Sequence, residues 1–300
     1  TLSILPMLHR PQHPRATEAT TKYFITQTMA ATIMLFAGTM NTWYTGSWSI
    51  TQPMLPYTTM MMTISLMMKL GLAPMHFWYP DVIQGTTFNT AMVISTWQKI
   101  APLALLYLTT MNSHHNTMLV LGSTSIILGG LMGLNQTQTR KILAFSSITH
   151  MGWLIIALKM NPTIATMTML IYMIMTTTMF YSLNSTKAKT LTDMGTNYYF
   201  SPTLLTVTTL TLMSLGGLPP LTGFMPKWLI MTELLKLDLT TLTTTLALST
   251  LPSLFFYIRI SYLSVLTTPP NSTNTNHKWR LNTKLSEMTM PTITLTTMLL

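Results

Sequence analysis

The chain has 300 residues, of which only 7% are charged and 48% are hydrophobic, and its mean hydropathy is +0.39. Soluble domains carry about a quarter charged residues because their surfaces face water, so this composition excludes a soluble domain and indicates a protein embedded in lipid. The net charge is +10, but the basic residues are scattered between apolar stretches, which argues against a nucleic-acid partner. Cysteine is absent, which excludes disulfides, iron–sulfur ligation and thiolate chemistry on this chain.

Apolar stretches long enough to span a membrane as helices, about 17–25 residues, follow one another along the chain. Two of them are interrupted by glycine and proline. The last begins near residue 288 and is too short to span, and the chain starts without methionine, so truncation at both ends is expected. The predicted spans are 20–39, 57–84 (interrupted), 87–110, 117–135, 142–158, 163–184, 200–234 (interrupted) and 240–263, with a truncated ninth from 288.

The basic residues between these spans predict the topology, because short loops rich in Lys and Arg stay on one side of a membrane. If each interrupted stretch crosses once, the opposite side receives only Lys159 and Lys236. Counting either stretch as two helices would remove this asymmetry, so eight complete crossings are predicted. The basic side receives Arg10, Arg15, Lys22, Arg140, Lys141, Lys187, Lys189, Arg259, Lys278, Arg280 and Lys284.

The two interrupted stretches are expected to be discontinuous helices that run in opposite directions. Paired Gly/Pro-interrupted segments in opposed halves indicate an inverted-repeat transporter with its site near the breaks. Unwound backbone at membrane depth is tolerated only against protein or water. The breaking residues are Gly71, Pro74 and Pro80 in the first stretch, and Gly216, Gly217, Pro219, Pro220, Gly223 and Pro226 in the second.

Three lysines, Lys69, Lys99 and Lys227, lie inside the apolar spans, each near a proline that is expected to break its helix. A lysine at the centre of a span costs about 2.5–3.5 kcal/mol on insertion scales. Unlike arginine, lysine can release its proton when it leaves water. Moving one charge against roughly 180 mV takes about 4 kcal/mol, which a change of about three in a lysine pKa supplies. A proton relay is therefore favoured over lysines that merely extend to the membrane surface.

Two histidines are further candidates. His150 lies within a predicted span and is a candidate to relay protons between lysines, or else a hydrogen-bonded structural residue. His76 follows the first break, where it is expected either to line the proton path or to cap the broken backbone. No metal-ligand spacing, phosphate-binding loop or nucleophile motif is present, so no metal site is predicted.

Long stretches of the chain resemble a known family. Residues 69–102, KLGLAPMHFWYPDVIQGTTFNTAMVISTWQKIAP, resemble the proton-conducting core of the antiporter-like subunits of respiratory complex I. Residues 14–24 (PRATEATTKYF), 133–153 (GLNQTQTRKILAFSSITHMGW) and 214–228 (SLGGLPPLTGFMPKW) resemble the subunit 2 family of vertebrate NADH dehydrogenase.

The resemblance implies an all-α polytopic membrane protein with two inverted five-helix repeats, related to Mrp-type cation/proton antiporter subunits, and 1–300 as a single incomplete domain. In that pattern Lys69 and Lys227 are the lysines of the two broken helices, Lys99 is the connecting lysine, and His150 lies on the central polar axis. The family pairs the first lysine with a glutamate on an earlier helix. Here the only N-terminal acid, Glu18, is expected in a loop, so that partner is missing.

The implied function is that of a proton-translocating membrane subunit of NADH:ubiquinone oxidoreductase in the mitochondrial inner membrane, driven by redox chemistry elsewhere. FMN, iron–sulfur clusters, NADH and ubiquinone are expected on other subunits, with no cofactor on this chain. The expected partners are other membrane-arm subunits, including neighbouring antiporter-like subunits, and the lipid bilayer, cardiolipin included.

Two alternatives stay open. A stand-alone Mrp-type cation/proton antiporter would need clustered carboxylates in its spans and would show sodium-dependent transport. A structural or assembly subunit would tolerate neutral substitutions at all three lysines without loss of pumping.

Overall fold

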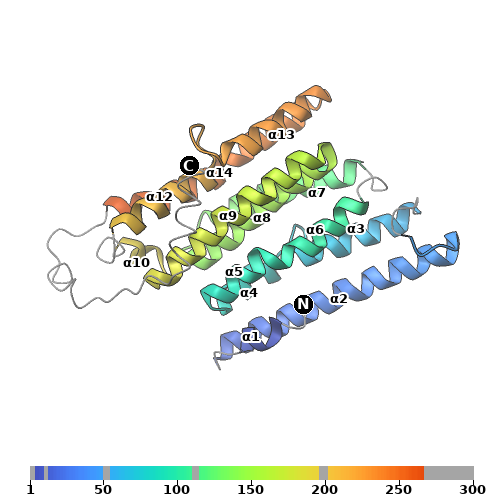
Figure 1. The fold of residues 1–300 in the computed structure, drawn as a ribbon, viewed down its shortest axis with the longest axis horizontal. Coiled ribbons are helices and arrows are strands. Elements are labelled where there is room, and N and C mark those ends of the chain that lie inside the picture. Colours follow the sequence, from blue (N-terminus) through green and yellow to red (C-terminus); the bar gives the residue numbers. More distant parts are fainter. Residues whose placement is uncertain (1–3, 10–12, 50–54, 110–114, 196–201, 267–300) are drawn as a thin grey trace.

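The computed structural model describes residues 4–9, 13–49, 55–109, 115–195 and 202–266. Within these ranges its regular secondary structure is helical, and an isolated bridge joins Gln138 and Thr190. The long helices lie side by side in an elongated bundle (Figure 1). The helices are α1 (Leu5–His9), α2 (Pro14–Thr45), α3 (Pro56–Leu70), α4 (Trp78–Gly85), α5 (Phe88–Ser95), α6 (Trp97–Thr109), α7 (His115–Gly133), α8 (Thr139–Met160), α9 (Pro162–Thr186), α10 (Leu191–Gly195), α12 (Pro202–Gly216), α13 (Phe224–Lys236) and α14 (Thr240–Leu266). The predicted ninth span lies outside the described residues, as do Arg10, Lys278, Arg280 and Lys284.

Five of the described helices are long and apolar enough to cross a membrane: Phe88–Thr109 (with its break), Asn116–Gly133, Thr139–Met160, Pro162–Thr186 and Thr240–Val265. The 32-residue helix α2 is long enough but is not among them, and the broken pairs α3/α4 and α12/α13 are too short as separate helices. The number of crossings therefore stays a prediction.

The helix α2 begins earlier than the sequence predicts. Proline suits the first position of a helix, where its missing N–H would be unpaired anyway, and Pro14 occupies it. The His13 side chain accepts a hydrogen bond from the Arg15 backbone N–H at 3.2 Å. The prediction that Glu18 lies in a loop is therefore wrong, because the capped helix already includes this residue.

Both predicted interruptions are present, and they run in opposite directions along the bundle (Figure 1). The first separates α3 from α4 at Gly71, whose φ of 72° is the left-handed conformation that glycine adopts without strain. The second separates α12 from α13 at Gly217, with φ of 83°. Each break therefore leaves the carbonyl end of a half-helix inside the bundle.

A third discontinuity, between α5 and α6, is not predicted from the sequence. It lies at Thr96, which ends α5 with φ −112° and ψ −75° and whose hydroxyl donates to the Met92 carbonyl at 2.7 Å. The expectation that Pro102 breaks this span is wrong, because α6 continues through it. Likewise Pro226 lies in the first turn of α13, where proline is tolerated.

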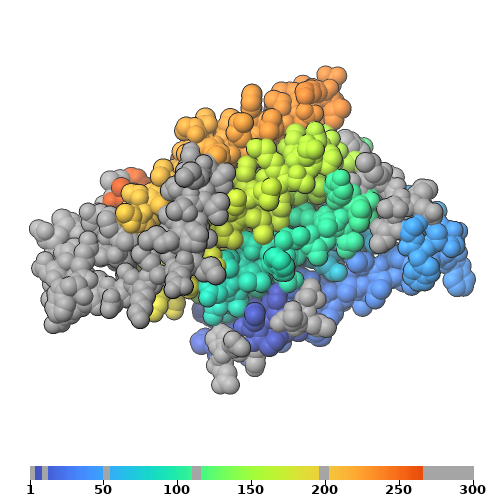
Figure 2. Space-filling view, in the orientation of Figure 1, coloured from blue at the N-terminus to red at the C-terminus, as the bar shows by residue number. Residues whose placement is uncertain are grey.

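The helix α8 is the centre of the bundle. Its spanning stretch is 83% buried, whereas the other four spanning helices are between 39% and 44% buried. Buried residues of α8 contribute to both hydrophobic clusters of the described core. By contrast α5 and α6 lie at the surface, between α2 in blue and α9 in yellow-green (Figure 2).

Glycines bring α7 and α8 together closely. A Cβ on Gly152 would lie 2.8 Å from the Gly122 carbonyl oxygen, and one on Gly129 would lie 2.7 Å from Thr149 Cγ2. Small residues at such positions let membrane helices pack backbone against backbone. The side chains on the central helix owe their fixed position partly to this contact.

Replacing Gly152 with alanine is expected to lower the stability of the bundle by about 1–3 kcal/mol, the usual cost of forcing a methyl group into a packed core. The thermal midpoint of the assembled complex in detergent would report it. Gly38→Ala on α2 is the matched control, because its Cβ would meet no atom within 4 Å. An equal effect of the two substitutions would contradict the close packing.

Threonine hydroxyls throughout the bundle bond to their own helices. On α2, Thr28, Thr32 and Thr39 donate to carbonyls three residues earlier at 2.9, 2.8 and 2.9 Å. A hydroxyl that bonds within its own helix needs no partner on a neighbour. Threonine can therefore occupy any face of these helices.

Candidate functional site

The amine of Lys227 binds the carbonyl end of the second broken helix. Lys227 is 7% exposed, and its Nζ donates to the Gly216 carbonyl at 3.0 Å and the Leu215 carbonyl at 3.5 Å. The last carbonyls of a helix lack partners within the helix and carry the negative end of its dipole. A lysine in the first turn of α13 thus caps the end of α12.

Two glycines make room for this cap. Gly217 combines its positive φ with a close approach, since a Cβ there would lie 2.8 Å from Lys227 Nζ. A Cβ on Gly223 would collide with the Ser214 carbonyl oxygen. The glycines that the sequence marks as breakers therefore also let the lysine reach the helix end.

His150 lies close enough to both Lys227 and Lys99 to interact electrostatically with each. Its Nδ1 is 2.7 Å from the Ser146 carbonyl oxygen of its own helix, α8. His150, Lys227 and Tyr172 line a cavity of about 30 Å³. That volume suits one or two water molecules.

Lys99 follows the unpredicted break at Thr96 and is almost fully buried, with 2% of its surface exposed. Its Nζ lies 3.1 Å from the hydroxyl oxygen of Tyr172 on α9, toward which it donates. The same amine lies 4.9 Å from the centre of the Tyr79 ring and 5.1 Å from that of Tyr172, distances at which aromatic faces attract a cation. Lys99 is thus held by aromatic groups and a hydroxyl.

Tyr172 connects Lys99 to His150. Its hydroxyl donates to the Ser95 carbonyl at 3.2 Å, just before the break, and its ring centre lies 5.6 Å from that of His150. Tyr172 is therefore in contact with the groups on both sides of it.

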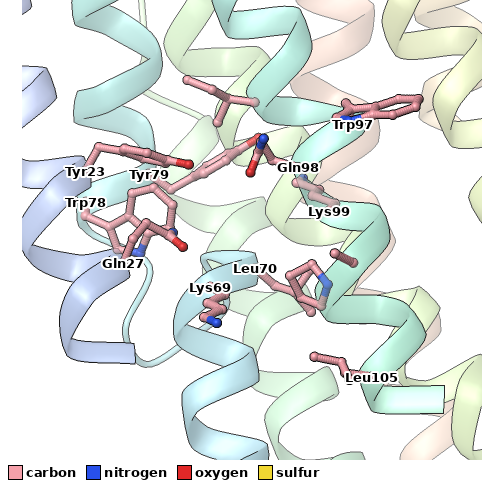
Figure 3. Close-up of a pocket in the computed structure, with 13 residues that line it drawn as sticks. Tyr23, Gln27, Lys69, Leu70, Trp78, Tyr79, Trp97, Gln98, Lys99 and Leu105 are labelled. Atoms are coloured by element: carbon pink, nitrogen blue, oxygen red, sulfur yellow. The ribbon is translucent and has the colours of Figure 1, made fainter. Parts of the chain in front are cut away.

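Lys69 and Lys99 line a common cavity of about 240 Å³, which has room for several water molecules. Figure 3 shows both lysines at this cavity, which is also lined by Tyr79, Gln98 and the α2 side chains Tyr23 and Gln27. Lys69 lies in the last turn of α3, at the first break, and its Nζ is 3.9 Å from Met34 Sδ. Trp97 points away from the other side chains.

The structure thus arranges four of the predicted site residues in one line, in which Lys99 and Lys227 are buried and Lys69 and His150 are half-buried. The order is Lys69, a cavity, Lys99, Tyr172, His150, a small cavity and Lys227. The line crosses from one broken helix to the other. Every member is either a group that can gain and lose a proton or a space that water can fill.

His76 is not part of this line. It is buried in the first break, with Nε2 3.2 Å from Met132 Sδ and its ring stacked on Phe77. It lines neither of the two cavities that hold the lysines. Its contacts are with α7 and with its own loop.

The carboxylates of the described chain lie apart from the line. Lys22 Nζ forms ion pairs with Glu18 at 2.6 Å and Asp81 at 2.7 Å, and Glu233 pairs with Lys236 at 2.7 Å. Lys69 makes no ion pair within the part of the chain that the structure describes. No group of three or more His, Cys, Asp or Glu side chains suited to a metal ion occurs there either.

Sequence reasoning missed the tyrosines. Tyr79, Tyr172 and Tyr257 are buried in the interior, and the first two hold Lys99. A tyrosine in an apolar span can indicate a polar site, because its buried hydroxyl needs a hydrogen-bond partner. This indication is weaker than that of a charged residue in the same place. Only the fold shows which tyrosines meet a lysine.

Two broken helices, buried lysines and an all-helical bundle define the class of antiporter-like, proton-translocating membrane subunits. The model for the family described as "NADH:quinone oxidoreductase/Mrp antiporter, TM" matches residues 2–253, and that for "NADH dehydrogenase subunit 2 C-terminus" matches residues 254–300. The chain belongs to the NADH-ubiquinone oxidoreductase chain 2 family, within which it is 48% identical to the Carassius auratus protein over 99% of this chain and 86% of that one. Identity to the Gallus gallus protein is 47%, over 100% of this chain and 87% of the relative.

Solved structures have the same fold. A chain of respiratory complex I from Thermus thermophilus with bound aureothin matches with a TM-score of 0.81 at 25% identity, over 94% of this chain and 69% of that one. A chain of the Mrp complex from Dietzia sp. matches with a TM-score of 0.76 at 17% identity, over 91% and 55%. The chain is thus a proton-translocating membrane subunit of NADH:ubiquinone oxidoreductase.

Proposed function

We propose that protons cross this subunit along the line from Lys69 through Lys99, Tyr172 and His150 to Lys227. The observation that supports the proposal most directly is the contact from Lys99 to Tyr172, with His150 beyond it. It joins two cavities, each of which holds a lysine at a broken helix. Together they form a route through the centre of the bundle.

The broken helices give the two outer lysines a way to change charge. A charged Lys227 is stabilised by the unpaired carbonyls of α12, whereas a neutral one releases them. Lys99 lies among rings and a hydroxyl. A charge on one lysine raises the cost of a charge on its neighbour, so protonation at one end favours release at the other.

The setting of the chain is part of the same proposal. FMN, iron–sulfur clusters, NADH and ubiquinone bind other subunits, and their redox chemistry drives the relay. Neighbouring antiporter-like subunits contact this chain in a mitochondrial inner membrane, with anionic lipids such as cardiolipin around it. The chain crosses the bilayer eight times. The family membership and the five spanning helices support this setting.

Lys227→Met in the assembled complex tests the relay. Reconstituted into sealed vesicles, the variant is expected to pump fewer protons per NADH oxidised and to lose most coupled turnover, because methionine fills the same space without carrying a proton. Acidification of the vesicle interior against NADH consumption gives the ratio.

Lys236→Met is the matched control, since Lys236 lies on the same helix but is exposed and paired with Glu233. It is expected to pump as the parent enzyme does. An unchanged proton ratio in Lys227→Met, with the complex fully assembled, would remove Lys227 from the mechanism.

A further inference from the structure

A second polar cavity, of about 570 Å³, lies at the end of the bundle away from the relay. Its walls come from five helix ends: the starts of α2, α5 and α8 and the last residues of α4 and α9 with the segment after α9. Most of its lining side chains are basic or neutral polar. The lining residues are His13, Arg15, Ala16, Gln84, Gly85, Thr86, Thr87, Phe88, Gln138, Arg140, Asn184, Lys187, Lys189 and Thr190.

The cavity is positive. Arg15, Arg140, Lys187 and Lys189 line it, and no carboxylate does. Arg140 is fixed by donating to the Thr86 carbonyl and by lying 5.2 Å from the centre of the Phe88 ring. Its charge is close enough to that of Arg15 for the two to repel. An anion between them would relieve that repulsion.

The nearby acids are engaged elsewhere. Glu18 and Asp81 both bind Lys22. Asp193 accepts hydrogen bonds from the backbone N–H groups of Thr190 at 2.9 Å and Lys189 at 3.1 Å, and it does not line the cavity. Of these acids, only Asp193 interacts electrostatically with one of the four cations, Lys189, and the cavity keeps a net positive charge that an external anion would balance.

Helix starts add to the positive potential. The helices α5 and α8 begin at the cavity wall, at Thr87 and Gln138, and neither is capped by the side chain of that residue. The first N–H groups of a helix lack partners within it and carry the positive end of its dipole. Here these N–H groups add to the positive potential of the four basic side chains.

The depth of the cavity in the membrane follows from the same helices. Three spanning stretches, Phe88–Thr109, Thr139–Met160 and Pro162–Thr186, each have one end at this cavity. The ends of spanning helices lie where the hydrocarbon gives way to headgroups. The cavity is therefore level with the phosphates of one leaflet.

From this position and charge we infer that the cavity binds the phosphate group of an anionic membrane phospholipid. Basic pockets between spanning helices are suited to such headgroups, and the volume is in the range of pockets that hold small ligands. The inference rests on the anionic lipid environment of the proposed function. In this site Arg15, Arg140, Lys187 and Lys189 bind the phosphate.

The test uses the assembled complex in vesicles of phosphatidylcholine containing a minor fraction of phosphatidylglycerol with a photoactivatable acyl chain. Illumination and mass spectrometry are expected to map crosslinks to the peptides around residues 13–16, 84–88 and 184–190. Lys187→Gln and Lys189→Gln are each expected to reduce this crosslinking about fivefold, since a lysine near an anionic surface contributes about 1 kcal/mol. Lys141→Gln, on the same side but outside the cavity lining, is expected to leave it unchanged.

Three results would overturn the site. They are equal crosslinking in the parent and the Lys187/Lys189 double variant, displacement of the lipid by inorganic phosphate at physiological concentration, and crosslinks from these peptides to another subunit in place of lipid. Equal crosslinking would show that the lysines bind no lipid. Displacement by phosphate would indicate that the cavity binds a free anion, and crosslinks to another subunit would indicate that it binds a protein. Lys227→Met is expected to keep the lipid crosslinks while losing pumping, so that failure of the relay and failure of the lipid site are separable.

Discussion

Lys99→Met is expected to block proton transfer through the centre of the subunit, slowing it roughly a hundredfold, the lower end of what a positioned acid–base group contributes. Lys99 is the only lysine in the described line with contacts toward both cavities, through the first cavity and through Tyr172. Its loss separates Lys69 from Lys227. Proton uptake per electron, measured in sealed vesicles at matched NADH oxidation, reports the block.

Lys99→Arg separates charge from proton exchange. Arginine keeps the positive charge against the Tyr79 and Tyr172 rings but does not release its proton. The complex is expected to assemble and still fail to pump. Normal pumping by this variant would show that a fixed charge suffices, and it would refute a relay through Lys99.

Gly217→Ala is expected to be the most damaging of the small substitutions. The positive φ alone costs an L-residue roughly 1–2 kcal/mol, and the new Cβ would lie 2.8 Å from Lys227 Nζ. The amine would have to leave the Gly216 carbonyl. Coupled turnover and the thermal midpoint of the complex are both expected to fall.

Gly216→Ala is the matched control one residue earlier. Its φ is not positive, and its Cβ would meet Tyr257 only at 3.6 Å, an ordinary contact. Alanine is also the better helix former, by about 1 kcal/mol. A loss of pumping as large as that of Gly217→Ala would indicate that the break tolerates no added methyl group, and the argument from the lysine contact would then fail.

Much of the architecture could be predicted because apolar length and Gly/Pro interruptions are local signals. The breaks at Gly71 and Gly217 were predicted in this way. The break at Thr96 could not be, since threonine is not a breaker by itself and the nearby Pro102 drew the prediction six residues too far. The start of α2 was likewise misplaced, although Pro14 is a recognisable helix start.

The candidate site could be predicted only as far as charge reveals it. A buried lysine is expensive, so Lys69, Lys99 and Lys227 stand out in an apolar sequence. Tyr172 does not, because its ring suits the hydrocarbon and its hydroxyl acts only through groups distant in sequence, Lys99 and Ser95. The exclusion of His76 from the line also depends on where the first break folds, against Met132.

The self-bonded threonines change how the hydropathy of this chain should be interpreted. A hydropathy index assigns threonine a low value because its hydroxyl is assumed to need water. On α2, however, the hydroxyls of Thr28, Thr32 and Thr39 already donate to carbonyls of the same helix. Such a helix presents methyl groups to the acyl chains and is more lipophilic than its index suggests. Topology prediction from hydropathy will therefore undercount the membrane crossings of threonine-rich chains unless threonines that bond within their own helix are given a more apolar value.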